Sequence, residues 1–175
     1  WVDTITQNIG TQKCSGVYVA WAWGIGTNWN LDLIGTYSLK KETTPLPDTP
    51  TSAYDCQGII SPVCYPNPKW RHTATGTYDS NSWWALTARW RYYSKVKYEE
   101  TTDQIAADNL KAHNYLDLSA VFRFMDTNDV VIGVNNVFDK EPPMMGNTIS
   151  ANGNTQVGFY DTLGRYFFAD VTFRW

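Results

Sequence analysis

The clearest pattern in this chain is residues 116–124, Leu-Asp-Leu-Ser-Ala-Val-Phe-Arg-Phe, in which apolar and polar side chains alternate. Leucine, alanine and phenylalanine occupy every second position, and Asp117, Ser119 and Arg123 lie between them. Successive side chains of a β-strand point to opposite faces. The stretch therefore predicts a strand with one apolar face and one polar face.

The same alternation recurs along most of the chain. The other alternating stretches are 17–23, 31–40, 70–78, 84–92, about 130–137, and 167–175. Together with residues 116–124 they predict about seven strands, several of them longer than the ~5–6 residues usual in globular sheets. The fold class that follows is all-β, with an apolar and a polar face.

The connections between these strands alternate in length. Links at 26–28, 79–82 and 126–129 are short, whereas those at 42–67, 97–112 and 138–158 are long. In an antiparallel up-and-down meander, alternate connections fall at opposite ends, so all the tight turns share one end. Short turns at one end and long loops at the other are typical of outer-membrane barrels.

The composition fits strands in a membrane better than the other classes. The 175 residues include 9 Trp, 11 Tyr and 7 Phe, and aromatics near strand ends are typical of the two girdles of a membrane barrel. The longest nearly unbroken apolar run, 17–26, is about half of the ~20 residues that a transmembrane helix needs. With 14 Lys+Arg against 17 Asp+Glu, the chain has no basic footprint for nucleic acid.

The odd number of predicted strands indicates an incomplete barrel. Bacterial single-chain barrels have an even number of strands, and counting back places the start of the first strand at the long-loop end. Residues 1–12 lack the alternation of an eighth strand. We therefore expect residues 1–175 to be the C-terminal fragment of a longer barrel.

Several motifs resemble one family. They are Gly-Val-Asn-Asn-Val-Phe-Asp-Lys at 133–140, Tyr-Asp-Thr-Leu-Gly-Arg-Tyr at 160–166 before a terminal aromatic, and the segment 54–72 with its two cysteines. In these the chain resembles the TonB-dependent outer-membrane receptors. The resemblance implies strands 16–22 of a 22-stranded transmembrane β-barrel whose N-terminal plug lies outside this chain. It also implies uptake of a scarce nutrient, of siderophore, cobalamin, haem or carbohydrate type, energised through TonB.

The resemblance also implies a location and partners. These are the outer membrane of a Gram-negative bacterium, its lipid, the barrel assembly machinery, an unknown nutrient ligand, and the TonB complex through the missing N-terminal region. Alternating apolar residues before a terminal aromatic match the outer-membrane assembly signal, although lipid-facing side chains alone would give the same pattern. The residues are Phe167, Ala169, Val171, Phe173 and Trp175.

Charged side chains fall on the predicted polar face and would face the barrel lumen. We interpret them either as a ligand path or as a solvated wall of charges that pair across strands. Lys40 falls on the same face by alternation. The candidate lumen-facing charges are Asp32, Arg71, Arg89, Arg91, Asp117, Arg123, Asp170 and Arg174.

The cysteines predict one disulfide. Cys56 and Cys64 lie close together in a segment rich in Pro, Gly and Ser, as in a stapled loop of an oxidising compartment. Two free thiols are the alternative, and Cys14 is expected to be unpaired.

The sequence predicts no catalytic residues, metal site or cofactor. His72 and His113 are the only histidines, and neither has a serine and an acidic partner in a triad pattern. Two other functions stay open beside nutrient transport. One is a small closed membrane barrel with a structural or adhesive role, and the other is a soluble ligand-binding barrel.

Overall fold

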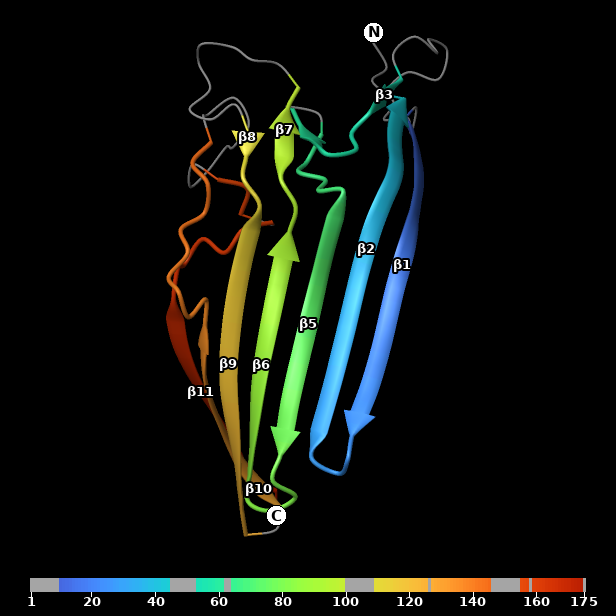
Figure 1. Cartoon of the computed structure of the whole chain (residues 1–175). Helices are drawn as coiled ribbons and strands as arrows, with labels where there is room; N and C mark the ends of the chain where they lie inside the picture. The colour runs from blue at the N-terminus through green and yellow to red at the C-terminus, as the bar shows by residue number, and fades with distance from the viewer. Residues whose placement is uncertain are drawn as a thin grey trace, which may run out of the picture.

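The computed structural model describes residues 10–44, 53–61, 64–99, 109–125, 127–145, 155–157 and 159–174. Seven long strands form one antiparallel sheet in the order β1-β2-β5-β6-β9-β10-β11 (Figure 1). The prediction of an all-β antiparallel meander is confirmed. No helix in the described ranges is long and apolar enough to cross a bilayer. The strands are β1 (Thr11–Ile25), β2 (Trp29–Thr44), β5 (Trp70–Asp79), β6 (Trp84–Tyr93), β9 (His113–Phe124), β10 (Asn128–Asn135) and β11 (Tyr166–Thr172).

Tight turns join the strand pairs at one end of the sheet. They lie between β1 and β2, between β5 and β6, and between β9 and β10, at the bottom of Figure 1. Gly26 and Asn81 take the left-handed conformation, with φ of 62° and 54°, which glycine and asparagine tolerate best. Asn28 Nδ2 donates a 2.6 Å hydrogen bond to the Asp79 carbonyl oxygen and so ties two neighbouring turns together.

One face of the sheet is apolar across all seven strands. The strand pairings place one apolar residue from each strand in a single row, and these side chains are largely uncovered: Trp23 is 53% exposed and Phe167 78% exposed. The row is Trp23, Leu31, Gly76, Ala88, Leu118, Val134 and Phe167. Within the described part of the chain, no second layer covers this face, although Trp70 of the same face covers Gly35.

The opposite face carries the polar partners of the same strands. Asp32 pairs with Thr75, Thr75 with Arg89, and Arg89 with Asp117, so charges and hydroxyls line up across β2, β5, β6 and β9. We refer to this side as the polar face.

A β-bulge interrupts the alternation in β2. Ser15 pairs with Lys40 while Gly16 pairs with Ser38, which leaves Leu39 as the extra residue. Beyond the bulge, Lys41 pairs with Cys14 on the polar face. Regular alternation would have placed Lys41 on the other face; with the bulge, both Lys40 and Lys41 border a groove on the polar side.

The long connections build a second, smaller structure at the other end, which contains the short strands β3 (Tyr54–Asp55), β4 (Ile59–Ile60), β7 (Val96–Tyr98) and β8 (Asn109–Leu110). β3 pairs antiparallel with the last residues of β2. Strand β4 pairs parallel with β7, and β7 pairs antiparallel with β8. The buried apolar side chains of this end form what we call the loop core: Ile60, Val96, Leu110, Met145 and Tyr160.

Candidate functional site on the polar face

The most connected charged group on the polar face is Arg91 of β6. Its Nε and one terminal nitrogen donate to Asp117 of β9 at 2.8 and 3.0 Å. Both terminal nitrogens donate to Asp161, at 2.9 and 2.5 Å, in the segment that leads into β11. The guanidinium carbon also lies 4.8 Å from the centre of the Tyr115 ring. Arg91 thus fastens the chain before β11 onto the polar face.

Asp117 is the matching acceptor of this network. Its side chain is only 5% exposed, and it accepts hydrogen bonds from Arg89, Arg91 and the backbone nitrogen of Asn136. A buried carboxylate is tolerated when its oxygens are satisfied in this way. Asp117 therefore holds β6, β9 and the end of β10 together.

Aromatic rings continue the network into the loop core. The Asp161 backbone nitrogen donates to the Tyr115 hydroxyl at 3.3 Å, and His113 packs edge-on against Tyr160 with ring centres 5.0 Å apart. Burial raises the pKa of the Tyr160 phenol, because the charged form would lose its water. His113 Nε2 lies 3.0 Å from the Glu141 carbonyl oxygen.

Two further candidate arginines are also paired. Arg123 makes two hydrogen bonds to Asp79, at 3.0 and 2.7 Å, near the turn end. Arg174 lies 3.3 Å from Asp129. Exposed pairs of this kind add little stability. Four of the five candidate arginines therefore bind neighbouring carboxylates within the chain.

Arg71 differs from those four. Among the described residues no carboxylate lies within ion-pair distance of Arg71, nor of the Lys41 ammonium group. Both line a groove of about 330 Å³ on the polar face towards the long-loop end. We call this the basic groove; its lining includes Ser38, Lys41, Asn67 and Arg71, and also Lys40, which is paired with Glu42.

Of the acidic candidates, Asp32 faces Thr75 across the strand pair, and Asp170 accepts a hydrogen bond from the Thr172 hydroxyl at 3.3 Å. Neither Asp32 nor Asp170 has an ion pair among the described residues. Among the described residues, five of the eight candidate charges therefore form ion pairs within the chain. The three without an ion pair are Asp32, Arg71 and Asp170.

The two cysteines of the long loop are bonded. Cys56 and Cys64 form a disulfide with a Cα–Cα distance of 5.5 Å, and both side chains are buried. The Cys56 backbone nitrogen donates to the Lys41 carbonyl oxygen at 2.9 Å, which anchors the bridged loop to β2 beside the basic groove. Cys14 is free and exposed.

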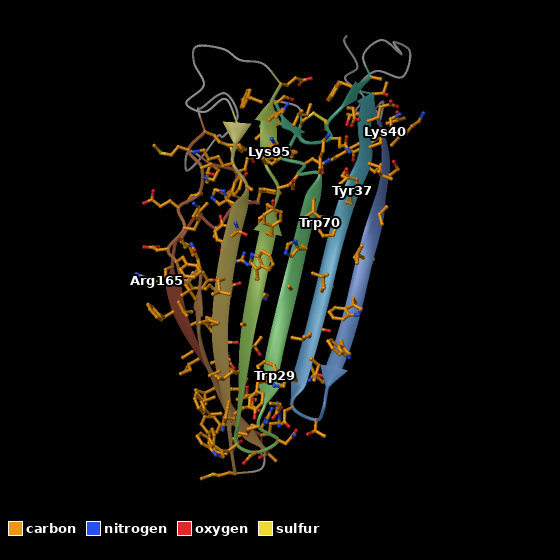
Figure 2. The ribbon with its side chains drawn as sticks, in the orientation of Figure 1. Trp29, Tyr37, Lys40, Trp70, Lys95 and Arg165 are labelled. Carbon is orange, nitrogen blue, oxygen red and sulfur yellow. A yellow bond between two sulfur atoms is a disulfide. The ribbon has the colours of Figure 1, made fainter. Side chains whose placement is uncertain are left out.

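Aromatic side chains on the apolar face gather at two levels. Figure 2 shows Tyr37 and Trp70 towards the long-loop end and Trp29 near the turns. In β5, Trp70 and Tyr78 are eight residues apart, which is about 26 Å along a strand. Apolar bands of outer-membrane barrels are ~25 Å tall, with aromatic girdles at both boundaries.

His72 belongs to the upper aromatic level. Its Nδ1 accepts a 2.9 Å hydrogen bond from the Trp70 indole, and its ring lies 4.6 Å from Trp90 and 5.2 Å from Tyr92. Among the described residues, no three His, Cys, Asp or Glu side chains are grouped closely enough to hold a metal ion.

The strand that carries the candidate assembly signal runs along the free edge of the sheet. Phe167, Ala169 and Val171 pair with Val134, Ile132 and Val130 on the apolar face. Phe173 follows β11 and is 63% exposed, and Trp175 lies outside the described residues.

The fold is that of part of a TonB-dependent receptor barrel, as solved structures show. A variant of the ferric enterobactin receptor PfeA of Pseudomonas aeruginosa, solved with enterobactin, matches with a TM-score of 0.63 at 18% identity, over 90% of this chain and 22% of that one. The closed form of the ferric-catecholate import receptor Fiu of E. coli K12 matches with a TM-score of 0.51 at 15% identity, over 75% of this chain and 17% of that one.

This chain spans about a fifth of the length of these receptors. Its sequence matches no protein-family model and no curated protein. The family resemblance seen in the sequence motifs is thus confirmed in the fold.

Sequence reasoning missed two groups that the structure makes central. Lys41 lies on the polar face only because of the bulge, which alternation does not reveal. Asp161 sits in a connecting segment, where no periodic pattern assigns it a direction. Its place in the Tyr-Asp-Thr-Leu-Gly-Arg motif was the one signal that singled out this segment.

Proposed function

We propose that this chain is the C-terminal part of an outer-membrane receptor that imports a scarce nutrient with energy supplied through TonB. The observation that carries the proposal is the row of apolar side chains across all seven strands, left uncovered opposite a charged face. In water such a face would be unfavourable by roughly 25 cal/mol per Å² of apolar area, whereas lipid accepts it.

The likeness to two siderophore receptors supports the same reading. Both are barrels of which this chain would form about a fifth, so residues 1–175 would be one wall of a longer barrel. A wide barrel has a polar lumen that must be plugged. The polar face would then line that lumen, and the plug and the TonB-contacting segment would belong to the region before this chain.

The remaining partners follow from this placement. The apolar face would contact outer-membrane lipid, and the edge strand with Phe167, Ala169, Val171, Phe173 and Trp175 would be read by the barrel assembly machinery. The nutrient would be of siderophore, cobalamin, haem or carbohydrate type. One neighbour is named as a ferric enterobactin receptor and the other as a ferric-catecholate import receptor, so ferric enterobactin is the first ligand to test.

A transport assay with the complete protein tests the proposal. Cells that lack their own catecholate receptors would express it with and without a functional TonB, and uptake of radioactive iron from ferric enterobactin would be measured, followed by haem, cobalamin and oligosaccharides. We expect uptake of one of these nutrients only when TonB works. A protein that stays folded in buffer without detergent, or that assembles in the membrane but transports none of them, would contradict the proposal.

A further inference from the structure

The basic groove differs from the rest of the polar face in how its cations are partnered. Arg89, Arg91, Arg123 and Arg174 each bind an aspartate within the chain. Lys41 and Arg71 share one groove with Lys40, which is paired with Glu42, whereas no carboxylate of the described residues lies within ion-pair distance of Lys41 or Arg71. Two cations in one concave surface repel each other unless an anion lies between them.

The bulge in β2 creates this arrangement. Without the extra residue Leu39, regular alternation would place Lys40 on the polar face and Lys41 on the apolar side. With the bulge, Lys40 forms a 2.8 Å ion pair with Glu42, two residues further along the strand, and Lys41 pairs with Cys14 on the polar face. Glu42 is thus paired with Lys40, and Asp55 accepts a 3.0 Å hydrogen bond from the Lys41 backbone nitrogen, while the Lys41 ammonium group has no ion pair among the described residues. Bulges of this kind re-aim a side chain and are frequent next to functional sites.

The walls of the groove offer hydrogen-bond donors. Asn67 Nδ2 donates to the Ser38 hydroxyl oxygen at 3.3 Å. The Ser38 hydroxyl can still donate its own hydrogen to a ligand oxygen. Asn67 itself is held in place because its carbonyl oxygen accepts a 2.8 Å hydrogen bond from Gly58 in the disulfide-bonded loop. The guanidinium of Arg71 can present two parallel N–H groups, which match the oxygens of a carboxylate or phosphate group.

We propose that the basic groove binds a small ligand through two or more anionic oxygens held between Lys41 and Arg71. The groove volume of about 330 Å³ suits a molecule rather than a single ion, since one water takes up about 30 Å³. The inference rests on the proposed function, because it makes the groove a recognition point for the anionic form of the imported nutrient.

Binding of inorganic pyrophosphate to the complete protein, folded in detergent, tests the groove. Calorimetry would compare the unsubstituted protein with Lys41→Ala, Arg71→Ala and the double variant, with maltose as a neutral ligand. We expect pyrophosphate to bind and maltose not to, and each single substitution to weaken pyrophosphate binding about tenfold, the loss of one charge-assisted hydrogen bond. Binding should weaken further as salt is added, because exposed charges are screened.

Arg123→Ala and Lys95→Ala are the matched controls. Arg123 lies on the same face but is occupied by Asp79, and Lys95, labelled in Figure 2, is an exposed lysine that does not line the groove. Each removes one positive charge, so both should bind pyrophosphate as the unsubstituted protein does. The proposal is overturned if either control weakens binding as much as Arg71→Ala. It is also overturned if the groove variants bind normally, or if pyrophosphate does not bind at millimolar concentration.

The two proposals fail in different ways. If the barrel assembles and TonB-dependent uptake is seen while the groove variants bind pyrophosphate normally, the groove proposal alone is wrong. If the groove variants lose binding but no nutrient enters the cells, the groove stands and the transport proposal is wrong.

Discussion

The long strands and the loop end of this molecule differ in how far their apolar side chains are exposed. Along the strands, large apolar residues such as Trp21 and Ile132 are 50% and 46% exposed. At the loop end, Ile60 and Val96 are completely buried, and Leu110 and Met145 are 2% and 4% exposed. The apolar side chains of the sheet rely on a surrounding medium for cover, whereas those of the long connections cover one another.

This difference in exposure separates the loop end, which buries its own apolar side chains, from the sheet, which leaves its apolar face uncovered. The loop core is small and is built from three connections, and a disulfide cross-links one of them, as is common where little apolar area can be buried. The sheet has no such core among the described residues. Arg91 joins the two regions, since it holds Asp117 of the sheet and Asp161 of the loop end.

The largest effect should come from placing a charge on the apolar face. Leu118→Arg should sharply reduce the amount of barrel assembled in the membrane, because an arginine facing lipid near mid-membrane costs about 2–4 kcal/mol. Thr75→Arg, on the polar face opposite Asp32, should be tolerated. Folded protein in outer membranes would be measured by its heat-modifiable migration. Spin labels at the same two positions should respond to oxygen at 118 and to a water-soluble nickel reagent at 75, and equal responses would disprove the assignment of faces.

Next in size should be the loss of the link between the regions. Arg91→Met leaves Asp117 buried without its main cation and should cost about 3 kcal/mol, with release of the segment around Asp161 from the sheet. Hydrogen exchange would show this as faster exchange at 159–165 while the strands stay protected. Arg123→Met, which breaks only an exposed pair, should leave exchange there unchanged. Equal effects of the two substitutions would refute the special role of Arg91.

A smaller and more local effect is expected at the disulfide. Cys56→Ser with Cys64→Ser should destabilise the loop end by roughly 2–3 kcal/mol through the added freedom of the unfolded loop, and leave strand assembly intact. Limited proteolysis would detect cleavage in the loops at a lower protease concentration. Cys14→Ser is the control because Cys14 is free. In the unsubstituted protein, Cys56 and Cys64 should react with an alkylating agent only after reduction, and reaction of both beforehand would exclude the bridge.

The smallest effect concerns pH. Because the folded-state pKa of Tyr160 is raised above its unfolded value of about 10, the stability it contributes is complete below pH 10 and is lost as the pH rises further. The loop end should therefore become more sensitive to proteolysis between about pH 10 and 11. Tyr160→Phe should remove part of this pH dependence. An identical pH profile for the variant would show that other groups control it.

Much of the fold could be predicted because strands of this length repeat their alternation many times. Residues 116–124 alone define two faces, and the alternation of short and long links then orders the strands. The positions Leu39 and Asp161 show where such reasoning ends. A bulge adds one residue without changing composition, and a side chain in a connecting segment has no period to direct it. Which arginines are occupied likewise depends on carboxylates that lie 26 or 70 residues away, as for Arg91.

The parallel pairing of β4 with β7 has a consequence for recognition by antibodies. Ile59 lies beside Lys97 and Ile60 beside Tyr98, and β8 adds Asn109 to Lys97 from the other side. The surface over these three short strands is therefore assembled from segments far apart in the sequence. An antibody raised against one linear peptide from these loops should bind the folded protein poorly. One selected on the folded, oxidised protein should lose its epitope when the chain is denatured and reduced.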